Sequence, residues 1–543
     1  MSSSTGGQLL VEALVDAGVT HVVGMSGHTT LPVLDALYEH PSIRFVLAKH
    51  EQTIGGMADG YARSSGRPGV CLVHLGPSAA NLLINIGAAY REYSPVIALT
   101  CNEQLQLQDR DVFNSWDQLS PFREVTKWAA RPYRAADIPR IVRSAVVRST
   151  LGRPGPVQID LPLDVLRQDA ELAEGKRPAY SSYSARSRPD PELLEAVPQM
   201  LSRAQRPVLL AGDGLVWAEG GPELQWLAER LACPVLVTLE ARGLIPEDSP
   251  YYGGAIGTWG DAAGNETLRS ADLVLAVGSR LADTDTLGWS LIPEGAAIVQ
   301  VDVEPGLLAH QYPVDIGLAC DPRRFLQDLL AILPAGGSLA ERDRWRSELR
   351  DKLEQERTGY LASAKDGSPV QHQRLIKELS EHINADAVVT AGAGRHSFHA
   401  GKLLARRPRS YLKSGGFGMM GFAFPAALGA KLAHPDRDVW CLVGDGDFSM
   451  TIQDVETAVR ENLNVITVVF NDSGYSSVKQ IQRTQYGERP IGVDFSRTDF
   501  ARFAEVFGAF GVSVKRSEEI GPALAAAKAS GKPAIIDVAV EPL

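Results

Sequence analysis

Residues 439–472 read VWCLVGDGDFSMTIQDVETAVRENLNVITVVFND, and this stretch decides the fold of the last third of the chain. Two apolar runs, 439–443 and 465–470, have the length and composition of buried strands. Between them a Gly-Asp-Gly turn leads into a segment with Ile452, Val455, Ala458 and Val459 at helical spacing. A strand, a helix and a second strand in this order predict two parallel strands of one sheet.

Two polar residues follow these strands, Asp445 after the first and Asn471 after the second. Because parallel strands end at the same edge of a sheet, we expect the two side chains to lie close together, beside a helix N-terminus. A carboxylate and an amide oxygen suit Mg²⁺, and a helix N-terminus with glycine amides suits a diphosphate. The stretch therefore predicts a Mg²⁺–diphosphate site, although a Gly-Asp-Gly turn by itself would be read as a turn that binds nothing.

The bulk properties of the chain narrow its class. It has 543 residues, enough for three domains, with 44% hydrophobic and 22% charged residues and a net charge of −11. The negative charge argues against a nucleic-acid partner. No apolar run is long enough to span a bilayer and the N-terminus lacks the pattern of a signal peptide, so a cytoplasmic protein without a membrane partner is expected. The five cysteines have no metal-site spacing and are expected to be reduced core thiols.

Three blocks of alternating strands and helices divide the chain. The predicted domains are residues 1–169, 192–345 and 366–543, with a polar linker at 170–191. Apolar runs such as 70–74 and 96–100 in the first block, and 207–211 and 273–277 in the second, are the expected strands. The predicted fold class is α/β, with three doubly wound parallel sheets.

Glu51 is the second feature that points to a site. It follows the apolar run 45–48 and opens a segment, EQTIGGMADGYAR, in which glycine and alanine are frequent. Small residues at that density let another helix or another subunit approach closely. A carboxylate at such an interface is costly unless it has a partner or a purpose, although a single Glu at a helix start also serves the helix dipole.

These motifs resemble those of thiamine diphosphate (ThDP) enzymes of the acetolactate synthase-like branch, and the resemblance covers nearly the whole chain. The branch includes acetohydroxyacid synthases, pyruvate oxidases, benzoylformate decarboxylases and 2-hydroxyacyl-CoA lyases. The resemblance implies a pyrimidine-binding first domain, a Rossmann-like central domain and a diphosphate-binding third domain. It also implies a homodimer or homotetramer in which two subunits share each active site.

The resemblance assigns roles residue by residue. Glu51 matches the glutamate that hydrogen-bonds the aminopyrimidine ring of the cofactor. Asp445, Asn471 and the Ser473 carbonyl match the protein ligands of Mg²⁺. The remaining cofactor-binding positions are Gly394, Arg395, His396, Gly418, Met420, Gly444, Gly446, Asp447, Gly474 and Tyr475, with Arg395 in place of the glutamine of acetohydroxyacid synthases.

The reaction is less well defined than the cofactor. The resemblance implies decarboxylation of a 2-oxoacid and transfer of the acyl carbanion to an acceptor carbonyl, as in acetolactate synthases. The alternatives are a benzoylformate-type decarboxylase, a 2-hydroxyacyl-CoA lyase or decarboxylase, and a non-catalytic cofactor-binding subunit. His28 and His74 are the candidate proton relays, and either could instead be structural. Asn114 and Gln118 lie near the family's catalytic glutamine in a loose alignment.

Two further observations concern specificity and a second cofactor. Ile481 replaces the tryptophan with which acetohydroxyacid synthases select larger acceptors, and this argues against branched-chain amino-acid biosynthesis. Gly278-Ser279-Arg280, Asp302 and Asp321 occupy positions that hold FAD or ADP in some relatives. FAD is not favoured, because Gly257-Thr258-Trp259-Gly260 replaces the Met-His-Gly motif found near the flavin. ADP or a CoA ester is the alternative ligand.

Overall fold

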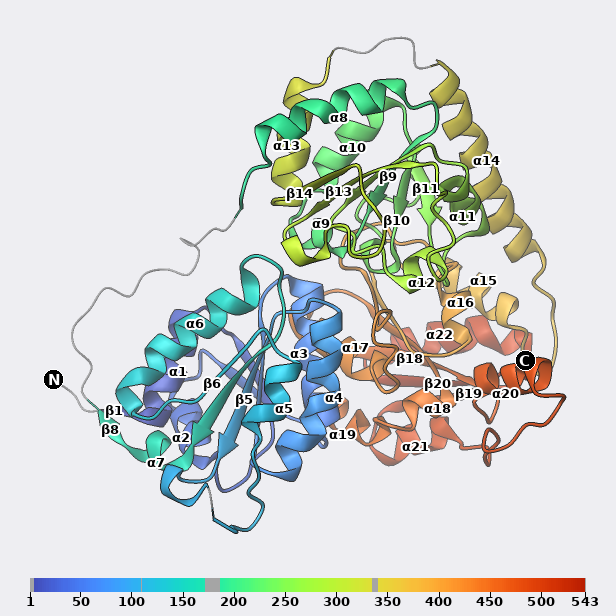
Figure 1. The fold of residues 1–543 in the computed structure, drawn as a ribbon. Helices are drawn as coiled ribbons and strands as arrows, with labels where there is room; N and C mark the ends of the chain where they lie inside the picture. The colour runs from blue at the N-terminus through green and yellow to red at the C-terminus, as the bar shows by residue number, and fades with distance from the viewer. Residues whose placement is uncertain (1–3, 109, 171–185, 335–339, 543) are drawn as a thin grey trace.

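The computed structural model describes residues 4–108, 110–170, 186–334 and 340–542. The chain forms three bodies, coloured blue, green to yellow, and orange to red in Figure 1. Each body contains a six-stranded sheet in which all paired strands are parallel, as predicted. Most of the linker predicted at 170–191 lies outside the described residues.

The first sheet has the strand order β3-β2-β4-β5-β7-β6. Its strands are β3 (Arg44–Leu47), β2 (His21–Gly24), β4 (Gly69–Val73), β5 (Val96–Asn102), β7 (Val157–Pro162) and β6 (Trp128–Ala130). Helices α1 (Gly6–Asp16), α2 (Leu31–Glu39) and α6 (Ile138–Thr150) contribute to the apolar core on one face. Helices α3 (Glu51–Ser65) and α4 (Pro77–Arg91) cover the other face, which meets the third body.

The third sheet repeats this topology with the order β16-β15-β17-β18-β20-β19. Its strands are β16 (Tyr411–Lys413), β15 (Val388–Ala391), β17 (Val439–Gly444), β18 (Val465–Asn471), β20 (Ala534–Ala539) and β19 (Phe510–Val514). Helices α15 (His372–His382) and α22 (Ile520–Ala529) contribute to the core on one face, and α17 (Ala423–Ala433) lies on the other.

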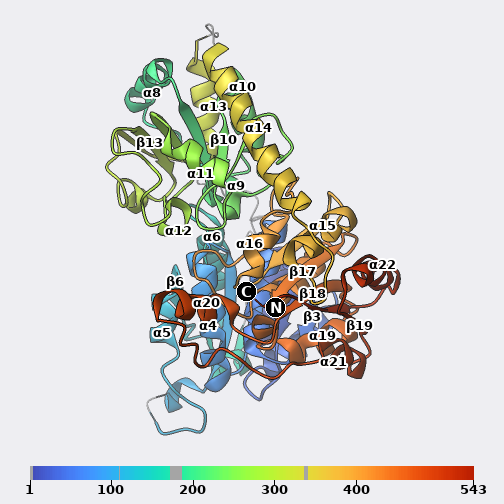
Figure 2. The ribbon, with the colours of Figure 1, turned by 90° about the vertical axis from the view of Figure 1, so that its right-hand side faces the viewer.

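The central sheet has a different order, β11-β10-β9-β12-β13-β14. Numbered within the sheet this is 3-2-1-4-5-6, the order of dinucleotide-binding folds. Its strands are β11 (Tyr252–Ala255), β10 (Val235–Val237), β9 (Pro207–Ala211), β12 (Leu273–Val277), β13 (Ala297–Asp302) and β14 (Ile316–Ala319). The central body sits above the other two in Figure 1, and Figure 2 shows α14 (Ala340–Ala362) running from it toward the third body.

The first and third bodies are joined by helices α3 and α17, which pack backbone against backbone. A Cβ atom added at Gly60 would lie 2.3 Å from the carbonyl oxygen of Ala426, and one added at Gly429 would lie 2.0 Å from that of Met57. Only glycine allows this approach. The small residues that the sequence concentrates after Glu51 therefore serve a contact within the chain.

One sequence prediction needs correction. The single helix predicted between β17 and β18 is three short pieces, α18 (Asp445–Phe448), η6 (Ile452–Asp454) and α19 (Val455–Arg460). The break occurs where the buried Asp454 carboxylate turns to accept the Lys49 N–H at 2.7 Å and the Thr457 hydroxyl at 2.8 Å. The predicted domain end at 345 falls inside α14. Because α14 packs on α11 (Ala262–Arg269) and β11, we assign the whole helix to the central domain.

The five cysteines are all buried and free, in agreement with the expectation of core thiols. Among the described residues, no helix combines the length and the apolar character needed to cross a membrane.

Candidate active site

A cavity of about 410 Å³ lies at the carboxyl edge of the third sheet. Eleven of the twelve predicted cofactor-binding residues line it, and the twelfth, Asn471, lies between two lining residues, Phe470 and Asp472. Ligands in open parallel sheets bind at this edge, outside the ends of the strands. The structure thus gathers at one cavity residues that the sequence spreads over 80 positions, from 394 to 475.

Asp445 and Asn471 end neighbouring parallel strands, as predicted, since Gly444 pairs with Phe470. One Asp445 carboxylate oxygen accepts the Ser473 N–H at 2.7 Å and the other accepts the Gly446 N–H at 2.8 Å. Burial and the nearby Asp472 raise the pKa of the Asp445 carboxyl to about 7. A cation at this edge would hold the carboxylate in its ionised form.

The Asn471 side chain is oriented by two hydrogen bonds. Its Nδ2 donates to the Asp537 carboxylate at 2.8 Å and to the Thr498 carbonyl at 3.0 Å. Its Oδ1 is buried and has no hydrogen-bond partner. A buried acceptor without a partner costs about 1–3 kcal/mol unless a ligand fills its lone pairs. The free oxygen therefore fits a metal ligand.

The donor set suits Mg²⁺ better than a metal that needs many side chains. No group of three or more His, Cys, Asp or Glu side chains suited to a metal ion occurs in the ranges that the structure describes. One carboxylate and one amide oxygen are enough for Mg²⁺, which usually retains waters and binds substrate phosphates. The third predicted ligand, the Ser473 carbonyl, accepts the Phe495 N–H at 3.1 Å and has a second lone pair left.

The loop after β15 contributes Gly394, Arg395 and His396 to the same cavity. His396 is buried, its Nε2 has no partner, and burial lowers its pKa to about 3, so the ring is neutral. Arg395 is half-buried and has no ion pair or side-chain hydrogen bond within the described part of the chain. A free guanidinium beside backbone amides is suited to phosphate oxygens.

Asp447 is a buried carboxylate in the wall of the cavity. It accepts the Ala393 N–H at 2.6 Å and the Gly421 N–H at 2.5 Å. These contacts tie together the loops after β15 and β16, which carry the other cavity residues. Asp447 therefore shapes the cavity, and its charge is directed at backbone amides.

Glu51 lies at the carboxyl edge of the first sheet, as the first residue of α3. The carboxylate is 6% exposed and accepts a hydrogen bond from Asn81 Nδ2 at 3.0 Å. Its negative charge acts on the neighbouring His74 ring. The edge thus holds a carboxylate with one neutral partner and room for another.

His28 and His74 meet at this same edge. Their ring centroids are 4.8 Å apart, His28 Nε2 lies 3.7 Å from a Glu103 carboxylate oxygen, and His74 Nδ1 lies 2.6 Å from the Thr29 hydroxyl. Burial and the His28 ring lower the pKa of His74, although Glu103 and Glu51 oppose the shift. The two rings thus lie together, with Glu51 near enough to act electrostatically on His74, and their role as proton relays stays a prediction.

Gln118, whose catalytic role stays a prediction, has its amide engaged by protein groups. The side chain is fully buried, and its amide donates to Asp160 at 2.7 Å and to the Cys101 carbonyl at 2.9 Å. Through its hydrogen bond to the Cys101 carbonyl, the Gln118 amide stabilises the C-terminal end of β5. Asn114 is half-buried, has a left-handed backbone with φ of 63°, and has no side-chain hydrogen bond within the described ranges, so it is the more available amide.

The two groups of site residues are joined within the chain by a contact, from Gln52 Nε2, next to Glu51, to the Met420 carbonyl at 3.1 Å. No residue of the first body lines the cavity at the third sheet. Large apolar side chains stand exposed near both, including Phe113 at 83% and Ile491 at 81%. Exposed apolar side chains gathered around an open site indicate a surface that another molecule covers.

The corresponding edge of the central sheet is occupied by charged side chains. A Cβ atom at Gly415 would lie 2.1 Å from Glu240 Oε1, and one at Gly416 would lie 2.8 Å from Arg280 Nη2. Burial raises the pKa of the neighbouring Asp213 to about 7. Asp302 and Asp321 line a separate cavity of about 250 Å³, and Asp321 caps α13 (Pro322–Ile332) through the Arg324 N–H.

Lys413 and Trp259 are among the residues lining this cavity that sequence reasoning missed. Lys413 ends β16 and its ammonium lies 3.7 Å from the centroid of the Trp259 ring. Trp259 was noted only as a departure from a flavin motif. A lysine at the carboxyl end of a buried strand, just before the Ser-Gly-Gly run, was the available signal.

Comparisons with known proteins agree with this geometry. Three parts of the chain match the domains of thiamine pyrophosphate enzymes: the N-terminal TPP binding domain at residues 4–120, the central domain at 194–329 and the C-terminal TPP binding domain at 392–538. The chain therefore belongs to the thiamine pyrophosphate enzyme family, another name for the ThDP enzymes.

Within the family the similarity is to acetolactate synthases. The chain is 33% identical to a probable acetolactate synthase large subunit of Methanocaldococcus jannaschii, over 99% of this chain and 92% of that protein. It is 32% identical to the acetolactate synthase of Mycobacterium bovis, with 99% and 88% covered, and to the acetolactate synthase large subunit of Corynebacterium glutamicum, with 99% and 87% covered. The resemblance inferred from the motifs is confirmed.

Proposed function

We propose that this chain is a ThDP- and Mg²⁺-dependent carboligase of the acetolactate synthase type. It decarboxylates a 2-oxoacid and transfers the acyl group to the carbonyl of an acceptor. The observation that carries the proposal is that the Asp445 carboxylate and the unpartnered Asn471 Oδ1 lie at the ends of two neighbouring parallel strands, at the edge of a cavity. The similarity to acetolactate synthases over 99% of the chain supports it.

Asp445, the Asn471 amide oxygen and the Ser473 carbonyl hold Mg²⁺ in this proposal. Gly394, Arg395 and His396 contact the diphosphate from the β15 side, and Gly444, Gly446, Gly474 and Tyr475 enclose it from the other. Asp447 positions the two loops through the Ala393 and Gly421 amides. Because it is an anion, we do not assign it a direct contact with the diphosphate.

When bound, ThDP supplies the electron sink that stabilises the acyl carbanion after CO₂ leaves. The chain orients the cofactor and controls its protons. The Gly418 carbonyl would accept a hydrogen bond from the pyrimidine amine, and Met420 would support the bound cofactor. Glu51 donates or accepts the proton at the pyrimidine ring, and its burial away from water makes that hydrogen bond strong.

Glu51 reaches the cofactor from a second copy of the chain. The cavity is lined entirely by the central and third bodies, so Glu51, His28 and His74 of the same chain do not complete it. A homodimer with two shared sites is the smallest assembly that supplies both halves, and a homotetramer would contain two such dimers. The exposed apolar residues around both edges are consistent with burial in this assembly.

The flavin found in some relatives does not fit this chain. Glu240 and Arg280 pack against Gly415 and Gly416, so side chains fill the space between the central and third bodies. We therefore derive no step from a flavin. Replacement of Glu240 and Arg280 would be needed before a ring could enter.

A second candidate is a 2-oxoacid decarboxylase that protonates the acyl group. The His28–His74 pair, with Glu103 at 3.7 Å from His28, favours it because it could deliver a proton at the site. The two functions differ in product and not in cofactor.

Proton NMR of pyruvate incubated with the protein, ThDP and Mg²⁺ tests the proposal. Acetolactate, with or without acetoin, is the expected product. Acetaldehyde alone would establish the decarboxylase instead. Unchanged pyruvate would contradict the use of pyruvate, and the next substrates to test would be larger 2-oxoacids and 2-hydroxyacyl-CoA esters.

A further inference from the structure

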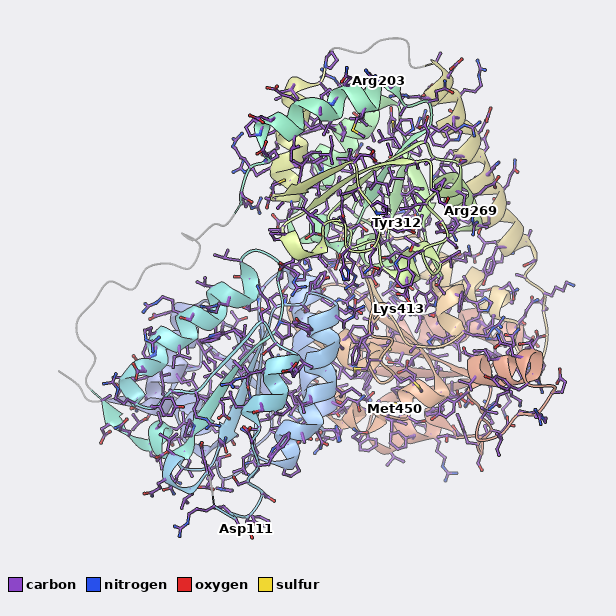
Figure 3. All side chains as sticks on the ribbon, viewed as in Figure 1. Asp111, Arg203, Arg269, Tyr312, Lys413 and Met450 are labelled. Atoms are coloured by element: carbon purple, nitrogen blue, oxygen red, sulfur yellow. The ribbon has the colours of Figure 1, made fainter. Side chains whose placement is uncertain are left out.

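Lys413 is a buried cation in the wall of the active-site cavity. It ends β16 and is 3% exposed, and Figure 3 labels it where the central body meets the third. Its ammonium lies over the Trp259 ring, whose centroid is 3.7 Å away. Trp259 packs in turn against Phe398, with centroids 6.1 Å apart, and all three side chains line the cavity.

This ammonium has no hydrogen bond and no ion pair with any group in the described ranges. Burial lowers the pKa of Lys413 to about 8, although Glu240, Glu92 and Asp447 lie near enough to oppose the shift. Buried charges in proteins are normally paired, because removing an ammonium from water without a partner costs several kcal/mol. The cavity side of Lys413 is therefore where a partner is missing.

The missing partner is not expected to be the diphosphate. Lys413 pairs with Ala391 on β15, and β15 pairs with β17, which Asp445 directly follows. Neighbouring strands are about 4.8 Å apart, so β16 lies about 10 Å across the sheet from the Mg²⁺ position. The diphosphate has Arg395 closer to it. Lys413, Trp259 and Phe398 instead form the side of the cavity toward the central body.

We propose that Lys413 binds the carboxylate of the acceptor 2-oxoacid. This inference rests on the proposed carboligase function. With pyruvate as both donor and acceptor, the donor loses CO₂ and its carbonyl carbon bonds to the acceptor carbonyl carbon. The acceptor oxygen takes one proton, so that two pyruvate anions and a proton give one acetolactate anion and CO₂. The acceptor carboxylate survives unchanged.

The donor loses its carboxylate in the reaction and the acceptor keeps its own. This difference indicates which of the two carboxylates Lys413 binds. A cation that held the donor carboxylate would stabilise the ground state and oppose the loss of CO₂. A cation that holds the acceptor carboxylate interacts with it before and after the new bond forms, so it orients the carbonyl without opposing a step. The Trp259 ring lies 3.7 Å from the ammonium and offers it no hydrogen-bond acceptor, and both side chains line the cavity.

The test compares charged and neutral acceptors in Lys413→Met, which keeps the length of the side chain and removes the charge. Wild type and variant are given pyruvate with ThDP and Mg²⁺, with and without added acetaldehyde. The ratio of acetolactate to acetaldehyde should fall about 10-fold to 100-fold in the variant, the range of a charge-assisted hydrogen bond. Acetoin formation from added acetaldehyde, which has no carboxylate, should be unchanged.

Two measurements separate this role from a structural one. The affinity of the apo protein for ThDP, followed by tryptophan fluorescence, should be unchanged in Lys413→Met and weakened in Arg395→Met. The unfolding midpoint of the apo protein should be equal to or above that of wild type, because an unpaired buried charge has been removed. Lys528→Met, an exposed cation paired with Asp438 in the same body, is the matched control and should change none of these.

An unchanged product ratio in Lys413→Met would overturn the proposal. A lower unfolding midpoint with an unchanged ratio would instead make Lys413 a counter-charge for Glu240 and Glu92. If the wild type forms no ligation product from either acceptor, the proposed carboligase function fails and this inference falls with it. If only the neutral acceptor reacts in the wild type, the carboligase stands and the carboxylate contact is wrong.

Discussion

The first and third sheets share one topology and carry different chemistry. Numbered within each sheet, both have the order 2-1-3-4-6-5. At the carboxyl edge of the first lie a carboxylate and two histidines, Glu51, His28 and His74. At the same edge of the third lie glycine-rich loops, an unpartnered amide oxygen and two unpaired cations. In the proposed function one edge moves protons, and the other holds an anionic cofactor with its metal.

The difference shows that topology decides where a site forms and that the loops after the strands decide what it does. The central sheet gives a second example in which the side chains after the strands matter more than the strand order. It has the strand order of dinucleotide-binding folds, but Glu240 and Arg280 fill the space toward the third body. We therefore propose that the central sheet keeps the strand order of a dinucleotide-binding fold without holding a flavin.

Glu51→Gln should have the largest effect on turnover while leaving ThDP affinity nearly unchanged, and so should distinguish the roles of the two sheet edges. If the first sheet only moves protons, turnover should fall about 100-fold to 10,000-fold, the usual contribution of general acid–base catalysis. ThDP affinity, measured by fluorescence, should change little. Glu124→Gln, at an exposed position in the same body, is the control. A Glu51→Gln protein with wild-type turnover would contradict the proton-transfer role of the first sheet edge.

Asp445→Asn should produce the complementary loss at the third sheet. The variant keeps the side-chain volume but removes the only carboxylate proposed to contact Mg²⁺. Mg²⁺-dependent binding of ThDP should weaken by about 100-fold or more, because loss of a mere outer-shell partner already costs about 10-fold to 100-fold. Isothermal titration with ThDP at fixed Mg²⁺ measures this. Unchanged affinity would place the metal elsewhere.

Gly60→Ala tests the close contact between helices α3 and α17, which joins the first and third bodies of the chain. The new methyl group would meet Ala426 backbone atoms at 2.3–2.4 Å, so we expect a loss of about 1–3 kcal/mol in the free energy of unfolding. Gly359→Ala is the matched control, since that exposed position in α14 has no atom within 4 Å of the new Cβ. It should gain up to about 1 kcal/mol from helix propensity. Equal midpoints for the two variants in chemical denaturation would contradict the close helix contact.

The smallest effect concerns pH and Lys413, whose pKa of about 8 lies below its ordinary value of 10.5. The charged and titratable groups that face it are Glu240, Glu92, Asp447, Arg63 and His396. Above pH 8 the folded protein loses this proton while the unfolded chain keeps it. The Lys413 contribution to stability therefore rises between pH 8 and 10.5, whereas binding of an acceptor carboxylate weakens.

The half-saturating concentration of pyruvate as acceptor should rise about 10-fold at one pH unit above 8, following the charged fraction of Lys413. Acetaldehyde as acceptor shows no such rise, and Lys413→Met removes the difference between the two. A parallel pH profile for both acceptors in the wild type would exclude Lys413 as the titrating group.

The sequence predicted the edge positions well because they depend on local patterns. The apolar runs before Asp445 and Asn471 fix two parallel strands, and parallel strands bring their ends together. The helix between them was predicted as one piece, and it is broken because Asp454 bonds to Lys49 of another body. Such long-range contacts leave no periodic signal.

The same limit applies to side-chain environments. Gln118 was proposed from a loose alignment with the family's catalytic glutamine, and only the fold shows that Asp160 and the Cys101 carbonyl engage its amide. Lys413 looked like an ordinary strand residue, and only the fold places it unpaired beside Trp259. Residue type and spacing identify candidates, whereas burial and partners decide among them.

Mixing two inactive variants tests most directly that the two edges come from different chains. Glu51→Gln and Asp445→Asn subunits, each without activity alone, are co-expressed with different affinity tags, and the doubly tagged assemblies are isolated. If the site is shared between subunits, each mixed dimer contains one intact site, and the isolated fraction should recover about half of the wild-type activity per dimer. If each chain completes its own site, no mixed assembly contains an intact one, and the absence of activity in the doubly tagged fraction would contradict the account.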